Sequence, residues 1–206
     1  NPMGGPFFPM QSISTSGAYD WEYFTIDNKH YLVVANYVSK KTGSEVYGQN
    51  SIIYQYDATR TKDKAFEEFQ SISTVGAFSW QYIKIGGDKH FLVVANLKKN
   101  LEIYQYNEIR YNNDKKTTFA LIDTKNELGA RGIEAFKIDD KYYLIGAYSD
   151  TSVIYQYNND KFEEMTGMTS ITSKPSIYDW TYFQLNNKHF LASANNGGTI
   201  SYIYEY

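Results

Sequence analysis

The sequence predicts an all-β chain folded as a β-propeller, with four four-stranded antiparallel blades. Three observations lead to this prediction. A signature that begins at Trp21 is written again from Trp80, from Ile133 and from Trp180. A second signature, Ile53-Tyr-Gln-Tyr, follows the first copy and has a counterpart after each of the others. The chain also holds 21 Tyr and 12 Phe among 206 residues, a composition that favours strands, and no helical period competes with it.

Each copy of the first signature splits into two strands around a polar turn. In the first copy the turn is Asp27-Asn28, and the runs on either side of it are apolar or aromatic. Such a pattern is typical of a β-hairpin. The Ile-Tyr-Gln-Tyr segment predicts a third strand, and a fourth is predicted at residues 66–74, 117–124 and 162–172. Each repeat is therefore expected to form a four-stranded meander.

The middle strand of each repeat predicts how the repeats are arranged. In the first copy it contains the continuous apolar run Leu32-Val-Val-Ala, so both of its faces must be covered. In a radial array the neighbouring blades cover them. A repeat of roughly 50 residues is also the spacing typical of such arrays.

The two ends of the chain predict how the array closes. Residues 7–15 match residues 66–74, which form the predicted fourth strand of the first repeat, and the last repeat stops at Tyr206 after its third strand. We therefore expect residues 7–15 to supply the missing strand and to close one propeller domain that spans residues 1–206. A fragment of a longer propeller, cut at equivalent points, would show the same ends, so this alternative stays open. The predicted repeats are 16–74, 75–124, 125–172, and 173–206 together with 7–15.

The composition argues against several classes of function. The formal net charge is −3 and Lys and Arg are scattered, so the chain has no basic field for binding nucleic acid. No apolar run approaches the length of a transmembrane helix, so no membrane insertion is expected, and the first ten residues lack the features of a signal peptide. The sequence contains no cysteine, which excludes disulfides, thiolate metal sites and cysteine nucleophiles.

The repeat pattern resembles a known family. Its elements are Gly17-Ala, Trp21-Glu-Tyr-Phe, Tyr31-Leu-Val-Val-Ala-Asn, Ile53-Tyr-Gln-Tyr and Phe66-x-x-Phe-Gln-x-Ile-x-Thr. Together they are similar to the EAR or EPTP (epilepsy-associated, epitempin) repeat, whose best-known carriers are the leucine-rich glioma-inactivated proteins. The resemblance covers nearly the whole chain. It implies a secreted, extracellular β-propeller that binds other proteins, without catalysis and without a required cofactor.

The chain departs from that family in two ways. The family's propellers usually have seven blades, whereas this sequence has four copies, and its third copy has Ile133 and Tyr148 where the other copies have Trp and Asn. Family members can also hold a metal ion in the central channel through acidic groups near the start of the innermost strand. The resemblance therefore implies a Ca²⁺ site at Asp20 and Asp179, although the two other repeats have Ser and Gly at that position.

Several residue types that suggest chemistry have a structural explanation here. His30, His90 and His189 share one repeat position, so they are spread around a ring and cannot converge on a metal ion. We expect them to serve hairpin packing or hydrogen bonding, and we expect the repeated tryptophans in the core between blades. Adjacent glutamates such as Glu67-Glu68 point to opposite faces of a strand, and no Gly-x-Ser-x-Gly motif occurs. No catalytic residue is predicted.

Positions that break the repeat are the best candidates for contact with a partner. An insertion between the second and third strands of the first repeat carries Lys40, Lys41 and Tyr47. Such an insertion projects from one rim of a ring, and a rigid ring lowers the cost of ordering the loops that it presents. Harmless loop variation explains the insertion equally well. The turn at Asn195 and Asn196 is a second candidate.

Two classes of partner stay open at this point. The first is an extracellular or cell-surface protein that docks on the rim loops. The second is a glycan, because tyrosine rings suit stacking on sugars and a repeated array would act as a multivalent lectin. The tyrosines in question are Tyr54, Tyr56, Tyr104, Tyr106, Tyr155, Tyr157, Tyr204 and Tyr206, half of which are expected to face neighbouring blades. A homo-oligomer, with a ring assembled from two chains, also stays open.

Overall fold

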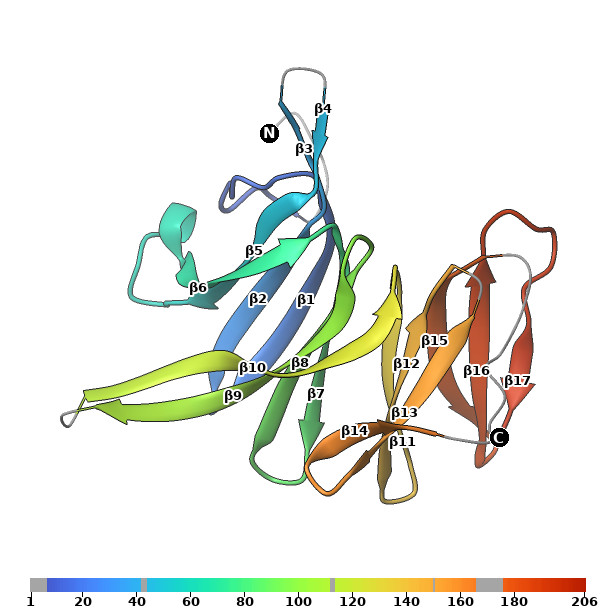
Figure 1. Ribbon diagram of the computed structural model, residues 1–206. Coiled ribbons are helices and arrows are strands. Elements are labelled where there is room, and N and C mark those ends of the chain that lie inside the picture. The colour runs from blue at the N-terminus through green and yellow to red at the C-terminus, as the bar shows by residue number, and fades with distance from the viewer. Residues whose placement is uncertain (1–6, 42–43, 112–113, 150, 166–175) are drawn as a thin grey trace.

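The computed structural model describes residues 7–41, 44–111, 114–149, 151–165 and 176–206. Within those residues the regular structure is β-strand, apart from the short 3-10 turn η1 (Lys62–Lys64). Four antiparallel sheets follow one another along the chain and fan out around an arc (Figure 1). No helix in the described part of the chain is long and apolar enough to cross a membrane.

The first sheet has the strand order β1-β2-β5-β6, and the second has the order β10-β9-β8-β7. Their strands are β1 (Ala18–Ile26), β2 (Lys29–Asn36), β5 (Gly48–Tyr56), β6 (Phe66–Val75), β7 (Ala77–Ile85), β8 (Lys89–Asn96), β9 (Asn100–Tyr111) and β10 (Asp114–Leu128). A separate hairpin of β3 (Ser39–Lys41) and β4 (Ser44–Val46) is inserted between β2 and β5. It projects from the rim of the arc (Figure 1).

The third sheet has the strand order β11-β12-β13-β14, and the fourth has the order β15-β16-β17. Their strands are β11 (Ile133–Ile138), β12 (Lys141–Ala147), β13 (Ser152–Asn158), β14 (Lys161–Glu164), β15 (Ile177–Leu185), β16 (Lys188–Asn195) and β17 (Ile203–Glu205). All-β architecture with antiparallel propeller blades, the fold class that the sequence predicts, is confirmed.

The hairpin turns follow from the local sequence. Asp27 and Asn28 adopt φ angles of 49° and 61°, and Asn186 and Asn187 adopt the same pair of angles in the fourth sheet. Two consecutive residues at positive φ make the two-residue turn whose twist matches the flanking strands, and Asn and Asp tolerate that conformation better than other non-glycine residues. The turns fix the strand register and so decide which side chains share a face.

The second and third sheets each pack one face on the preceding sheet and the other on the following sheet. In the first sheet Phe24 is buried against the second, and in the second sheet Trp80 points back toward the first. Ile83 lies on the opposite face and packs toward the third sheet. Val93 and Val94, adjacent in β8, are both fully buried, one in each of these two cores. The middle strands β2, β8 and β12 are therefore covered on both faces, as the sequence predicts, whereas β16 in the fourth sheet is only partly buried.

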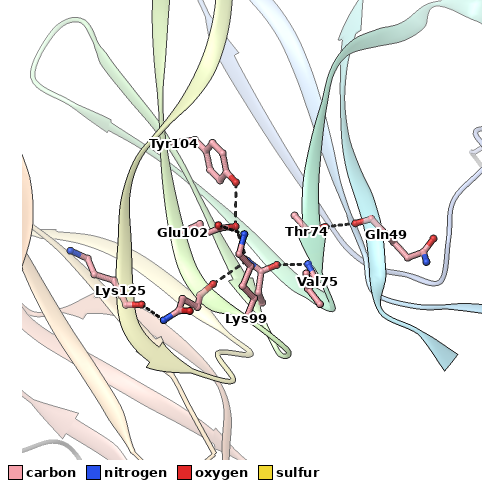
Figure 2. Close-up of polar contacts among 9 residues, drawn as sticks. Gln49, Thr74, Val75, Lys99, Glu102, Tyr104 and Lys125 are labelled. Atoms are coloured by element: carbon pink, nitrogen blue, oxygen red, sulfur yellow. Dashed lines mark hydrogen bonds and ion pairs between the residues drawn. The ribbon is translucent and has the colours of Figure 1, made fainter.

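The asparagine that ends a middle strand ties the sheets together at their turns. Asn96 Oδ1 accepts a hydrogen bond from Val75 N at 3.2 Å, and Asn96 Nδ2 donates to the buried carboxylate of Glu102 at 3.2 Å. Glu102 also accepts a hydrogen bond from the Tyr104 hydroxyl at 3.2 Å and forms an ion pair with Lys99 Nζ at 2.5 Å (Figure 2). A buried carboxylate is tolerated only with such a set of partners, so this network fixes the loop between β8 and β9.

The closure that the sequence predicts is corrected by the structure. Among the described residues the fourth sheet has three strands, and residues 7–15 form no strand. Instead Gln11 Nε2 donates a hydrogen bond to Phe66 O, and Gln11 Oε1 accepts one from Phe66 N, both at 2.8 Å. These two hydrogen bonds hold the segment against the first sheet. The fourth sheet lies at the other end of the arc (Figure 1), so residues 7–15 do not reach β17.

The repeated tryptophans divide according to their place in the arc. Trp80 and Trp180 are 3% and 2% exposed, which confirms that they lie in the core between blades. Trp21 is 40% exposed because it lies on the outer face of the first sheet.

A glycine allows the third and fourth sheets to approach each other. A Cβ added to Gly132, just before β11, would lie 2.6 Å from both Tyr178 O and Asp179 Cα, closer than real Cβ atoms come to backbone atoms. Gly48 in β5 has ordinary φ, and a Cβ there would meet nothing within 4 Å.

We therefore expect Gly132→Ala to lower the free energy of unfolding by about 1–3 kcal/mol, because backbone atoms cannot move aside without separating two strands. The matched control, Gly48→Ala, should be neutral or stabilising by up to about 1 kcal/mol. Urea unfolding curves of the two variants and the wild type measure the difference. Equal midpoints for the two variants would show that the close approach at Gly132 is not required.

Candidate binding site at the rim of the arc

Three aromatic residues lie at β-bulges in equivalent places of three inner strands. Tyr19 in β1, Phe78 in β7 and Tyr178 in β15 are each the residue that the ladder to the next strand skips. A bulged residue is left out of the ladder, and its side chain is turned away from the usual alternation. Arg131, two residues before Ile133, has the same repeat position in the third copy.

These four side chains converge at one rim. The ring centroids of Tyr19 and Phe78 are 4.7 Å apart, and those of Phe78 and Tyr178 are 6.0 Å apart. The Arg131 guanidinium carbon lies 4.3 Å from the centroid of the Tyr178 ring. Such separations are typical of tilted aromatic pairs and of a cation over an aromatic face. Three sheets and the segment before β11 thus each contribute one side chain to a single surface.

The insertion in the first sheet adds two more rings to this surface. The Tyr37 ring lies 4.5 Å from that of Tyr19, and the Tyr47 ring lies 5.3 Å from that of Tyr37. Lys98 Nζ is 5.0 Å from the centroid of Tyr47. We call the set the rim cluster: Tyr19, Tyr37, Tyr47, Phe78, Lys98, Arg131 and Tyr178.

The rim cluster presents neutral hydroxyls and two cations. The hydrogen bond from the Tyr47 hydroxyl to Glu45 raises the pKa of Tyr47 to about 12, and burial raises the pKa of Tyr37. Both phenols therefore stay protonated at physiological pH. Tyr19 is 56% exposed, so an aromatic face at this rim is open to solvent.

Carboxylates follow the rim cluster along the inner strands and accept main-chain hydrogen bonds from the next sheet. Each one therefore satisfies an N–H that packing would otherwise leave without a partner. The pairs are Asp20 Oδ2 with Trp80 N at 3.0 Å, Glu22 Oε1 with Tyr82 N at 2.9 Å, and Glu134 Oε1 with Tyr182 N at 2.9 Å.

Burial raises the pKa of three acids on the inner strands: Glu22, Glu134 and Asp179. Their main-chain hydrogen bonds oppose that effect, and the charge of Asp20 adds to it at Glu22 and Asp179. The inner strands therefore hold acids that interact with one another and resist ionisation.

The expected calcium site at Asp20 and Asp179 is not supported by the donors present. Asp20 Oδ2 already accepts the Trp80 amide hydrogen, and the Trp180 amide bonds to Asp179. Ca²⁺ requires six to eight oxygen ligands. Among the described residues, no group of three or more His, Asp or Glu side chains could hold a metal ion. These residues do not fit a calcium ion held by the protein alone.

The residues predicted to contact a partner have different places in the structure. Tyr47 belongs to the rim cluster. Lys40 and Lys41 lie in β3, and their side chains fall outside the described residues. Asn195 Nδ2 donates to the main chain of its own turn at 2.9 Å, so it stabilises that turn. Asn196 N donates to the main chain next to β15 at 2.9 Å, which places this turn near the rim.

The histidines have the structural role that the sequence predicts. His30, His90 and His189 each hydrogen-bond through Nδ1 to a tyrosine hydroxyl across their hairpin, at 2.7, 2.6 and 2.7 Å. They lie in three different sheets. These histidines therefore do not form a shared site.

The tyrosines that suggested a repeated sugar site lie mostly between sheets. Tyr104 and Tyr155 are 7% and 2% exposed. Tyr106, Tyr157 and Tyr204 pack against the same inter-sheet cores. Tyr104 and Tyr155 are therefore closed to a sugar, whereas Tyr56 and Tyr206 are 36% and 69% exposed. The expectation that at least half of the eight tyrosines face neighbouring blades is confirmed.

A comparison with known families matches residues 7–57 and 65–107 to the EPTP domain. The chain contains EPTP repeats. Two curated relatives are thrombospondin-type laminin G domain and EAR repeat-containing proteins. The Homo sapiens protein is 43% identical over 91 residues, which are 44% of this chain and 12% of the relative. The Mus musculus protein is 30% identical over 158 residues, which are 75% of this chain and 21% of the relative.

The EPTP chain therefore spans about a fifth, or less, of the length of these relatives. Solved structures similar to it include a Bombyx mori GH32 β-fructofuranosidase, with 12% identity over 88% of this chain and 43% of that one. A xylan β-1,4-xylosidase from Bacillus halodurans has 13% identity over 95% of this chain and 42% of that one. Both have a TM-score of 0.46, so neither likeness bears on function.

The sequence reasoning missed most of the rim cluster, although a signal was present. An aromatic residue precedes the signature tryptophan by two positions in three copies of the repeat, as Tyr19, Phe78 and Tyr178. Regular strand alternation would place such residues with the blade core. The bulges turn them toward the rim instead, and only the structure shows the bulges.

The acid Glu134 provides a test of the inner-strand arrangement. The pKa of Glu134 is higher in the folded state than in the unfolded state. Its favourable contribution to the free energy of unfolding is therefore fully present below about pH 4, and it is lost as the pH rises through the folded-state pKa. Glu134→Gln removes this titration and keeps an oxygen that can accept from Tyr182 N. We expect it to match or exceed wild-type stability at neutral pH and to reduce the decline above about pH 4.

The control is Glu134→Ala, which leaves the Tyr182 amide without its partner and should lower stability by about 1–3 kcal/mol. Thermal unfolding of the three proteins across acidic and neutral pH measures both effects. A steeper loss of stability in Glu134→Gln than in the wild type would contradict the raised pKa.

Proposed function

We propose that this chain is a non-catalytic binding module of a secreted, extracellular protein, and that its rim cluster docks a protein partner. The observation that carries the proposal is the convergence of aromatic and cationic side chains from all four repeats at one rim. Tyrosine and arginine are enriched at the centres of protein interfaces, because they offer large apolar areas together with hydrogen-bond donors.

The support of the rim cluster favours binding. Tyr19, Phe78 and Tyr178 project from bulges in strands that are held in hydrogen-bonded ladders, so little main-chain freedom remains to be lost on docking. The strands β3 and β4 lie between Tyr37 and Tyr47 in the chain. The names of the relatives, which combine EAR repeats with a thrombospondin-type laminin G domain, support an extracellular setting.

Catalysis is not part of this proposal. In the described residues each histidine is engaged by a tyrosine within its own hairpin. The buried acids Glu22 and Glu134 are engaged by main-chain N–H groups of the neighbouring sheet. These groups are occupied in holding the sheets together.

Removing the exposed ring of the rim cluster should weaken binding without unfolding the protein. We expect Tyr19→Ala to reduce binding of the labelled chain to cell surfaces and matrix by about tenfold, the loss typical of a hot-spot aromatic. The matched control is Leu121→Ala, which truncates a 51% exposed apolar side chain on the outer strand of the second sheet. Saturation binding and melting temperature are measured for both variants. Equal binding by Tyr19→Ala and Leu121→Ala would overturn the role of the rim cluster.

The contribution of the hairpin is tested separately. Residues 47–49 must be kept, because Tyr47 O accepts from Gly76 N at 2.8 Å and Gln49 O accepts from Thr74 Oγ1 at 2.6 Å. Replacing residues 40–45 by Asn-Gly should lower binding and leave the melting temperature nearly unchanged, because β3 and β4 pair only with each other. A glycan array with free-sugar competition decides between partner classes. Saturable, competed binding to one sugar would replace the protein partner by a glycan.

A further inference from the structure

The turn between β16 and β17 contains the only asparagine in the sequence that is followed by glycine, at Asn196 and Gly197. Both residues are exposed. Gly197 adopts a φ angle of 94°, and a Cβ built on it would meet nothing within 4 Å. No side chain of its own, and no neighbour in the place of one, therefore shields the main-chain nitrogen of Gly197.

An asparagine side chain can react with the main-chain nitrogen of the residue that follows it. The nitrogen attacks Cγ, and a bond forms between them. The bond from Cγ to Nδ2 breaks, and Nδ2 leaves as ammonia with the proton of the attacking nitrogen. Water then opens the cyclic imide at either carbonyl carbon, which yields aspartate or isoaspartate. A hydrogen bond that holds the attacking N–H slows the reaction, and glycine favours it because its backbone is the least restricted.

The fold blocks this reaction at the asparagines that end the middle strands. In three repeats the N–H group after such an asparagine donates to the main-chain oxygen just before the inner strand. These hydrogen bonds run from Tyr37 N to Gly17 O at 3.1 Å, from Leu97 N to Gly76 O at 2.8 Å and from Asn196 N to Ser176 O at 2.9 Å. The attacking nitrogen is therefore engaged at Asn36, Asn96 and Asn195.

Asn196 lies one residue beyond that hydrogen bond. Within the described residues, neither its side-chain amide nor Gly197 N has a hydrogen-bond partner. The side chain of Asn195, in contrast, donates through Nδ2 to Ile200 O at 2.9 Å. Neighbouring asparagines of one turn thus differ at both groups that must meet, and only Asn196 leaves both of them unengaged.

Solvent access to this turn is a property of the rim, because the turn in the same place of the second sheet is exposed as well. The second sheet has neighbours on both faces. Lys98, the equivalent of Gly197 in that sheet, is exposed. The accessibility of Asn196 therefore does not depend on what covers the faces of the fourth sheet.

We propose that Asn196 is a site of spontaneous deamidation in the folded protein, with Gly197 N as the attacking group. The product carries aspartate or isoaspartate at this position, so one negative charge is added to the formal net charge of −3. Isoaspartate also routes the main chain of the turn through Cβ. Water is the only other reactant.

The new carboxyl arises near the rim cluster. Ser176 O accepts from Asn196 N, and Ser176 Oγ accepts from Arg131 Nη1. Arg131 covers the ring of Tyr178, and within the described residues it forms no ion pair. Deamidation thus places an anion near a cation of the rim cluster. The site goes beyond the proposed function, because its chemistry requires no partner.

Tandem mass spectrometry of the aged protein tests the reaction. The folded protein and the same protein in guanidinium chloride are incubated in parallel at mildly alkaline pH, and their peptides are analysed for replacement of an amide by a carboxyl. We expect Asn196 to convert in the folded protein at a rate within about threefold of that in the denatured protein, because an exposed turn needs little opening. Asn196→Gln should stay unchanged, because glutamine would have to form a larger ring.

The matched control is Leu97→Gly, which creates a second Asn-Gly pair where Gly76 O holds the following nitrogen. Asn96 is also buried, and its Nδ2 donates to Asn100 O at 3.1 Å. In the folded variant this pair should react at least about tenfold more slowly than in the denatured variant, because reaction requires local opening. Melting temperatures show whether the variants are folded.

An Asn196 that stays intact in the folded protein while the denatured protein converts would overturn the proposal. Equal folded-state rates at Asn196 and at the pair created by Leu97→Gly would overturn it too, since hydrogen bonds would then not select the site. The comparison at Asn196 uses the wild type alone, so it decides the matter even where Leu97→Gly does not fold. No residue of the rim cluster and no partner takes part in either measurement, so a failure here is distinct from a failure of the proposed function.

Discussion

The middle strands of the first three sheets are apolar on both faces, and the rest of the structure depends on covering both of them. A single sheet can bury one face against its own loops, but Val93 and Val94 point in opposite directions and both are fully buried. Two neighbouring sheets are needed to achieve this. The hydrophobic effect therefore acts between repeats more than within them, and the stability of one sheet is tied to the presence of the next.

That packing brings main-chain and acidic groups into contact at the inner strands. The amide hydrogens of Trp80, Tyr82 and Tyr182 find carboxylate partners on the preceding sheet. Burial raises the pKa of Glu22 and Glu134, so each link balances a desolvation cost against a hydrogen bond. Such links fix the order and spacing of the sheets because a shift would leave both partners unsatisfied. The narrow space at Gly132 has the same origin.

The rim cluster is a consequence of the repeating geometry. Within the arc, repeat-equivalent residues meet at the rim because their bulges lie at the same strand position. At its ends, surfaces that are internal elsewhere become external, and Trp21 is exposed where Trp80 is buried. For the proposed binding, this geometry holds the rim cluster on strands that the neighbouring sheets fix in place.

The sequence by itself determined the strands, the hairpins and the radial stacking, because hydrophobic period and turn chemistry are local. Asp27-Asn28 predicts its turn, and the equivalence of His30, His90 and His189 suffices to reject a shared metal site. The tertiary structure alone decided which side chains meet. The structure shows that residues 7–15 bond to the first sheet through Gln11, whereas the sequence predicts them in the fourth. It also shows that Tyr19, Phe78, Arg131 and Tyr178 lie together. Convergence of residues far apart in the chain depends on bulges and on the angles between sheets, and no local pattern of side chains encodes these.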